Sequence, residues 1–223
     1  SSQFHDMMKS VQQGQIQFDE LPKRKNQLAF SLLETLQEFA GPEAISNSEK
    51  PALLASLPVY LSVGKPHNDV QSRYLDRLKA VLAQERIQAE TLGTTFWTVK
   101  KPLIPIQKRM TEVAGCVVLA MERFYAVEGL YKRGSSDEKR VEHTRYPTPW
   151  AQIEAAMAYQ IGMPLLILKD RSLVGEGMFD PSTHDWLILE IDPEKPEELD
   201  SGMVNALLKS WADEVRAYYT GKK

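Results

Sequence analysis

The pattern of apolar and polar positions along the chain changes between residues 40 and 58. Leu28, Leu32, Leu36 and Phe39 recur at helical spacing, which predicts one amphipathic helix over residues 21–40. Gly41 and Pro42 then supply a stop signal, and breakers and small polar residues continue to residue 51. We therefore expect an N-terminal helical extension and linker over residues 1–50.

From residue 51 to residue 223, short apolar runs alternate with amphipathic segments. The runs predict strands at 58–63, 87–92, 115–120, 164–169 and 185–191, and the segments between and after them predict helices at 70–85, 103–113, 149–161 and 196–219. Parallel strands need crossovers, and right-handed crossovers place helices on both faces of the sheet. The pattern predicts a three-layer, flavodoxin-like α/β domain with about five parallel strands in the order 2-1-3-4-5.

A long polar insertion, residues 121–147, separates the third strand from the next helix. Its central stretch KRGSSDEKR, residues 132–140, mixes charges of both signs. Such a composition is typical of a solvated mobile loop, which is what we expect here.

Ligands of open parallel sheets bind beyond the carboxyl ends of the strands, where the strand order reverses. The predicted loops at that edge are residues 64–69, 93–101, 121–149 and 169–180. Candidate binding residues should lie in these loops or in the first turns of the helices that follow them.

The helix predicted at 149–161 carries an acidic residue beside an apolar arc. Thr148 is the expected N-cap and Pro149 the expected first helical residue. On a helical wheel the large apolar side chains share one arc, and Glu154 lies at its edge; the arc consists of Trp150, Ile153, Met157 and Ile161. Glu154 is therefore expected in the second turn, near the ligand crevice.

Two interpretations of Glu154 stay open on spacing alone. In the first, the carboxylate is structural and reaches solvent or pairs with Arg123 or Arg145. In the second, it is a catalytic or ribose-binding group. Burial would raise its pKa while the helix N-terminus would lower it, so the pattern leaves the net direction open.

Four segments in order carry a resemblance to a known family. They are PVYLSVGKPHNDVQSRYLDRLKAVL, GCVVLA, the spacing Trp150-x-x-x-Glu154, and GMPLLIL. Together, over residues 58–192, they resemble a Toll/interleukin-1 receptor (TIR) domain and the related nucleoside deoxyribosyltransferases. In enzymatic TIR domains the Glu of W-x-x-x-E is the catalytic carboxylate of NAD cleavage, and in the transferases a Glu on the matching helix is the nucleophile.

The resemblance implies an N-glycosidase in which Glu154 is catalytic and NAD, or a related nucleotide, is a substrate rather than a cofactor. It also implies bacterial antiphage defence or signalling, with a homo-oligomer or a partner defence protein, and the helices at 21–40 and 196–219 are candidate contacts. Two alternatives stay open. One is a non-catalytic nucleotide-sensing or assembly module, and the other is a deoxyribosyltransferase or nucleotide N-hydrolase.

The remaining candidate residues lie in the predicted crevice loops. Ser62, Gly64 and Lys65 end the first strand and could meet a phosphate, although the frame of a P-loop is absent. Arg123 follows the third strand and could also face a phosphate. Trp97 is a candidate either for stacking on a base or for anchoring its own loop by hydrophobic contact. Trp150 is a candidate for lining the pocket, although core packing is favoured for it.

Composition narrows the classes of partner. The formal net charge is −3, and no apolar run is long enough to span a bilayer, so we expect neither nucleic acid nor a membrane as partner. A single cysteine excludes a disulfide framework, and four scattered histidines give no metal-ligand spacing. We expect a cytoplasmic protein without a metal. Because the first residue is Ser, we also expect a processed or excised piece.

Overall fold

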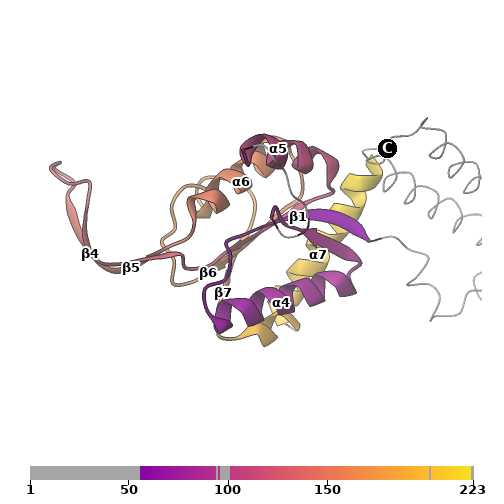
Figure 1. Cartoon of the computed structure of the whole chain (residues 1–223), viewed down its shortest axis with the longest axis horizontal. Coiled ribbons are helices and arrows are strands. Elements are labelled where there is room, and N and C mark those ends of the chain that lie inside the picture. Colours follow the sequence, from indigo (N-terminus) through magenta and orange to yellow (C-terminus); the bar gives the residue numbers. More distant parts are fainter. Residues whose placement is uncertain (1–55, 94, 96–100, 201, 222–223) are drawn as a thin grey trace, which may run out of the picture. The chain divides into compact units, whose positions relative to one another are not determined.

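The structure is a computed structural model that describes residues 56–93, 95, 101–200 and 202–221. The helix predicted at 21–40 lies outside these residues. The described part is an α/β domain that begins with strand β1 at residue 57 (Figure 1). None of its helices is long and apolar enough to cross a membrane.

Five strands form the central sheet, and all of its pairings are parallel. They are β1 (Leu57–Val63), β2 (Ile87–Glu90), β3 (Cys116–Ala120), β6 (Leu165–Asp170) and β7 (Ile188–Ile191). Their spatial order is β2-β1-β3-β6-β7, which is the predicted 2-1-3-4-5 order once the strands of this sheet are counted alone. The flavodoxin-like prediction is therefore confirmed.

Helices cover both faces of the sheet (Figure 1). Helices α4 (Asp69–Gln84) and α7 (Gly202–Gly221) pack on one face, and α5 (Leu103–Glu112) and α6 (Pro149–Gln160) pack on the other. Every residue of β3 is buried, as expected for a strand covered on both sides. Because side chains alternate along a strand, the sheet separates two apolar cores.

The helix predicted at 196–219 was placed too early in the chain. Residues Pro196–Asp200 form a separate 3-10 helix, and α7 begins at Gly202. Gly202 has a positive φ of 68°, a conformation that favours glycine. A second short 3-10 helix, Gly177–Phe179, lies between β6 and β7 and buries Phe179.

The stretch 132–140, predicted as a solvated loop, is an exposed turn over residues 132–138, but the rest of the insertion is not a loop. This segment forms an antiparallel hairpin of β4 (Phe124–Tyr131) and β5 (Lys139–Tyr146), which extends away from the sheet (Figure 1). The stretch 132–140 supplies its turn and the first residues of β5. Strand β4 contains aromatic and β-branched residues, which favour extended backbone even where most side chains are exposed.

Candidate functional site

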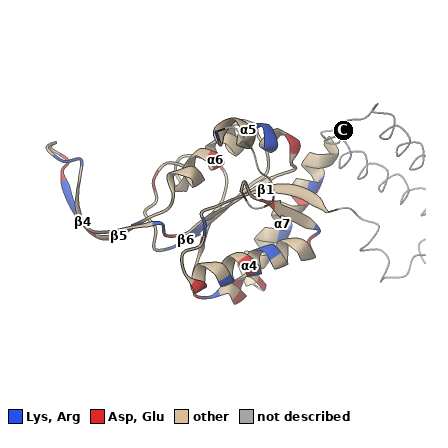
Figure 2. Ribbon diagram, in the orientation of Figure 1, with Lys and Arg blue, Asp and Glu red and all other residues tan. Residues whose placement is uncertain are grey.

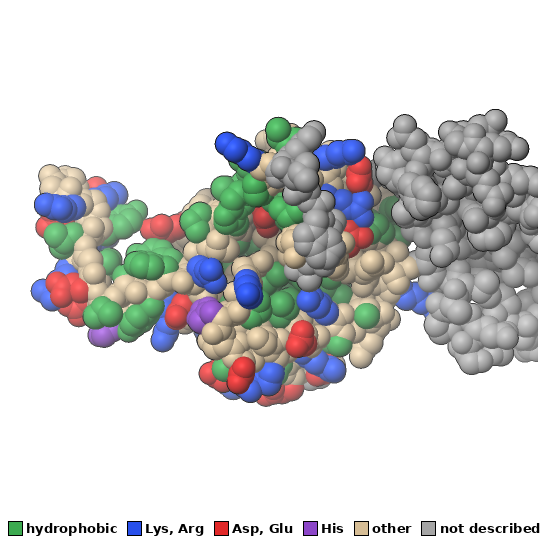
Figure 3. Space-filling view, in the orientation of Figure 1, with side chains coloured by type: hydrophobic (Ala, Val, Ile, Leu, Met, Phe, Trp, Pro, Cys, Tyr) green, Lys and Arg blue, Asp and Glu red, His purple; other side chains and the backbone are tan. Residues whose placement is uncertain are grey.

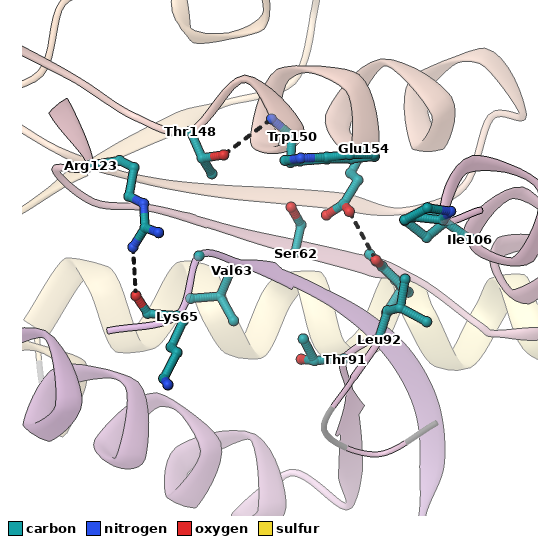
Figure 4. A pocket seen from close by; sticks show the side chains of 13 residues that line it. Ser62, Val63, Lys65, Thr91, Leu92, Ile106, Arg123, Thr148, Trp150 and Glu154 are labelled. Atoms are coloured by element: carbon teal, nitrogen blue, oxygen red, sulfur yellow. Dashed lines mark hydrogen bonds between the residues drawn. The ribbon is translucent and has the colours of Figure 1, made fainter. Parts of the chain in front are cut away.

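The candidate site lies at the carboxyl ends of β1 and β3, on either side of the point where the strand order reverses. A pocket of about 320 Å³ opens there (Figure 4). Strand β1 provides its floor, α5 and α6 provide walls, and the residues next to β2 and the hairpin complete the rim. The topology therefore brings together loops that are far apart in the sequence.

Glu154 is the buried acidic group of this pocket. It lies in the second turn of α6, and only 7% of its surface is exposed. The helix begins as predicted, with Thr148 as N-cap accepting a hydrogen bond from the Trp150 backbone N–H at 3.4 Å and with Pro149 as first residue. The first helical turn therefore fixes where Glu154 projects toward the sheet.

The buried face of α6 consists of small side chains, not the bulky apolar arc. Apart from Glu154, its buried residues are Ala151, Ala155 and Ala158, whereas Trp150, Ile153 and Ile161 are about 40% exposed. Alanines let the helix backbone approach β1 and β3 closely. Glu154 lies at the boundary of the two arcs, where it faces both the sheet and the pocket.

Two hydroxyl groups from β1 hold the Glu154 carboxylate. Tyr60 donates a hydrogen bond from its phenol to Glu154 Oε1 at 3.0 Å, and the Ser62 hydroxyl points toward the same carboxylate (Figure 4). Both residues are at most 1% exposed, and they lie two positions apart, which puts their side chains on one face of β1. The strand therefore presents a pair of fixed donors to one carboxylate.

No cation of the described chain forms an ion pair with Glu154. Arg145 pairs with Glu122 at 2.7 Å, and Arg123 donates to the Lys65 carbonyl oxygen at 3.3 Å (Figure 4). The expected pairs of Glu154 with Arg123 or Arg145 are therefore absent, and the buried carboxylate is hydrogen-bonded to Tyr60 instead.

Burial dominates the electrostatics of this site. It raises the pKa of Glu154 above its usual value, and the hydrogen bonds from Ser62 and Tyr60 offset only part of that effect. Burial, reinforced by the neighbouring Glu154, also raises the pKa of the Tyr60 phenol and of the Cys116 thiol. Tyr60 thus stays a donor, and Cys116 is not a thiolate nucleophile.

Six of the seven site residues expected from the sequence line this one pocket. Ser62, Gly64, Lys65, Arg123, Trp150 and Glu154 surround it, and Trp97 lies outside the described residues. The Trp150 ring lies beside the Glu154 side chain at the rim (Figure 4), so the preference for core packing of this Trp was wrong. Sequence reasoning had named Thr148 only as a helix cap, and it missed the other lining residues, which are Tyr60, Val63, Thr91, Leu92, Pro102 and Ile106.

Only a weak feature of the sequence points to Tyr60 as a site residue. It is a polar-tipped aromatic residue in an otherwise apolar strand, two residues before Ser62. Its partner is 94 positions away in the sequence, so only the topology shows the pair.

A larger hollow of about 400 Å³ lies between α5 and α6. Its walls are apolar apart from Gln107 and Gln160, and it holds no charged group. No group of His, Cys, Asp and Glu suited to a metal ion occurs among the described residues. The pocket around Glu154 is therefore the stronger candidate for chemistry.

Comparison with protein-family models, curated proteins and solved structures found no match. The function is therefore argued from the geometry of the pocket.

Proposed function

We propose that this domain is an N-glycosidase that cleaves the bond between nicotinamide and ribose in NAD, or the corresponding bond of a related nucleotide. The observation that carries the proposal is a buried carboxylate, Glu154, at the wall of a nucleotide-sized pocket. It accepts a hydrogen bond from Tyr60, has the Ser62 hydroxyl nearby, and forms no ion pair with a cation of the described residues. Carboxylates so placed against a sugar stabilise the oxocarbenium-like charge of glycosidic cleavage.

The proposed reaction balances without any group beyond the nucleotide and water. The C1′–N bond breaks, and its electron pair leaves with neutral nicotinamide. The Glu154 carboxylate offsets the positive charge on the sugar, either across space or as a transient ester. Water then adds its oxygen to C1′ and releases a proton.

Tyr60 and Ser62 serve as positioning residues in this proposal. Both hydroxyl groups favour the ionised form of Glu154, and the hydrogen bond from Tyr60 fixes the direction of Oε1. The low-polarity surround strengthens the attraction between the carboxylate and the cationic transition state. Trp150 at the rim offers an aromatic face to the ring of the leaving base.

Two cations at the pocket mouth support a phosphorylated substrate over a bare nucleoside. Lys65 and Arg123 are exposed, line the pocket, and form no ion pair within the described ranges of the chain. Other arginines of the domain, such as Arg109 and Arg216, are paired with carboxylates. Unpaired cations at a cleft attract anions, and phosphate is the anion that a nucleotide carries.

The test is release of the free base. The protein is incubated with NAD, AMP and deoxyadenosine, and nicotinamide or adenine is quantified by chromatography. We expect nicotinamide from NAD, and a loss of about 100-fold or more in Glu154→Gln, which keeps the size of the side chain but removes its charge. Glu197→Gln is the matched control, because Glu197 is exposed and does not line the pocket.

Each outcome separates the alternatives. Base release from deoxyadenosine alone would identify a deoxyribosyltransferase-like or nucleoside N-hydrolase activity. NAD binding in calorimetry without base release would identify a nucleotide-sensing module. Equal turnover by the parent and Glu154→Gln would remove Glu154 from the mechanism. A role in bacterial antiphage defence stays a prediction of the TIR resemblance.

A further inference from the structure

The hairpin of β4 and β5 exposes large apolar side chains on both of its faces. Phe124 and Leu130 lie on one face and Tyr125 and Val127 on the other, with 41–64% of each exposed. Apolar side chains are visible along the projecting hairpin in Figure 3. A two-stranded hairpin is at best marginally stable by itself in water. Apolar rows on a projecting arm indicate a surface that another protein covers.

The two edges of the hairpin differ. Strand β5 carries charged residues at half of its positions, namely Lys139, Arg140, Glu142 and Arg145. Near its base, β5 is also joined by a backbone hydrogen bond from Val174 N–H to the Arg145 carbonyl at 3.0 Å. Charges and covering segments are how proteins block pairing at sheet edges.

Strand β4 has no such protection. Its one charged residue is Glu128, which pairs with Arg140 of its own hairpin at 3.1 Å. Within the described residues, β4 pairs with β5 alone, so its outer edge has no strand beside it. An extended, apolar strand with an open edge is suited to adding another strand.

We propose that the outer edge of β4 pairs antiparallel with β4 of a second copy of this chain, about a two-fold axis at Val127. The result is a four-stranded sheet in the order β5-β4-β4-β5. A two-fold contact uses the same surface on both copies, so the strand must complement itself when reversed.

Strand β4 satisfies that condition. Pairing about Val127 places Phe124 opposite Leu130 of the second copy, so two apolar side chains meet on one face. On the other face, Tyr125 lies opposite Gly129 of the second copy, where the missing side chain leaves room for the aromatic ring. Apolar residues at both ends of the strand are thus brought together.

The charge of the hairpin also favours a copy of itself. Charges of both signs are nearly balanced, with Lys132, Arg133, Lys139, Arg140 and Arg145 against Glu128, Asp137, Glu138 and Glu142 (Figure 2). Such a surface attracts neither a polyanion nor a strongly charged protein. Two copies of the hairpin instead meet with nearly balanced charges on each side, so no large net charge opposes their contact.

The base of the hairpin connects this contact to the pocket. Arg123 and Thr148 flank the hairpin and line the pocket, and a backbone hydrogen bond from Arg123 N–H to the Tyr146 carbonyl at 2.9 Å closes the arm. A dimer formed through the β4–β5 hairpins would therefore also stabilise the wall of the pocket that Arg123 and Thr148 form.

Disulfide trapping tests the pairing. The single native cysteine, Cys116, is fully buried, so an introduced surface cysteine is the reactive one. In Val127→Cys the two introduced residues meet at the two-fold axis, within the roughly 7 Å between Cα atoms that a disulfide requires. In the control Glu142→Cys, three strand spacings of about 4.8 Å separate the two sites by at least about 14 Å.

We expect the unchanged full chain to show twice its own mass in light scattering at high micromolar concentration. Oxidation should crosslink Val127→Cys to a dimer at least ten times faster than Glu142→Cys, without loss of the folded signal in circular dichroism. A monomeric mass overturns the proposal. So does a dimer in which the two variants crosslink equally or not at all, because that dimer uses another surface. None of these readouts depends on catalysis.

Discussion

At the scale of single residues, Glu154 has an environment that favours its protonated form. Burial raises its pKa above the ordinary value of 4.5, while Ser62 and Tyr60 offset part of the shift. The folded state therefore binds this proton more tightly than the unfolded state does. The contribution of this group to stability is therefore fully present below pH 4.5 and is lost as the pH rises through the folded pKa. A carboxylate kept at such a cost at a pocket wall points to function.

Glu154→Gln should therefore stabilise the domain at neutral pH. Glutamine keeps the shape and accepts the Tyr60 hydrogen bond, but it carries no charge that burial penalises. We expect a melting temperature a few degrees above the parent at neutral pH, with the difference vanishing toward pH 4.5. Thermal unfolding across this pH range measures it.

The matched control is again Glu197→Gln, whose side chain is exposed. It should follow the parent at every pH. A Glu154→Gln protein that melts below the parent at neutral pH would show that the ionised carboxylate is stabilising, contrary to the burial argument.

At the scale of elements, α6 shows where hydrophobic patterning misleads. Its largest apolar side chains predict a core face, yet its alanines are the residues that pack on the sheet. Small residues carry little weight in an apolar pattern, although they allow the closest approach of helix and strand. The place of Glu154 in the second turn was predictable because Thr148 and Pro149 set the start of the helix.

Two adjacent alanines of α6 allow the effect of packing on stability to be measured apart from the effect of helix propensity. Ala155 is fully buried against the sheet, whereas Ala156 is exposed. We expect Ala155→Leu to lower the free energy of unfolding by about 1–3 kcal/mol through overpacking. Ala156→Leu should change it by less than about 0.5 kcal/mol.

Urea denaturation of both variants measures this difference. The same overpacking should displace the neighbouring Glu154, so nucleotide turnover should fall in Ala155→Leu and persist in Ala156→Leu. Equal stability of the two variants would mean that α6 does not rest on its alanine face.

At the scale of the whole molecule, the layered architecture follows from apolar runs such as that of β3, because a strand covered on both faces must be apolar throughout. The hairpin was not predictable in the same way. Its strands bury little surface, so charged residues interrupt the alternation from which strands are read. The contacts of Tyr60 with Glu154 depend on a crossover and on side-chain direction, which local patterns do not contain.

The hairpin is an appendage of the sheet, so its removal should spare the domain. Arg123 and Tyr146 are already joined by a backbone hydrogen bond at the base, so an Asn-Gly turn can replace residues 124–145. We expect a melting temperature within a few degrees of the parent, because neither apolar core includes a hairpin side chain. We also expect a monomer in light scattering, because the β4 edge is gone. A truncated protein that unfolds would make the hairpin part of the folding unit, and one that still dimerises would move the contact to another surface.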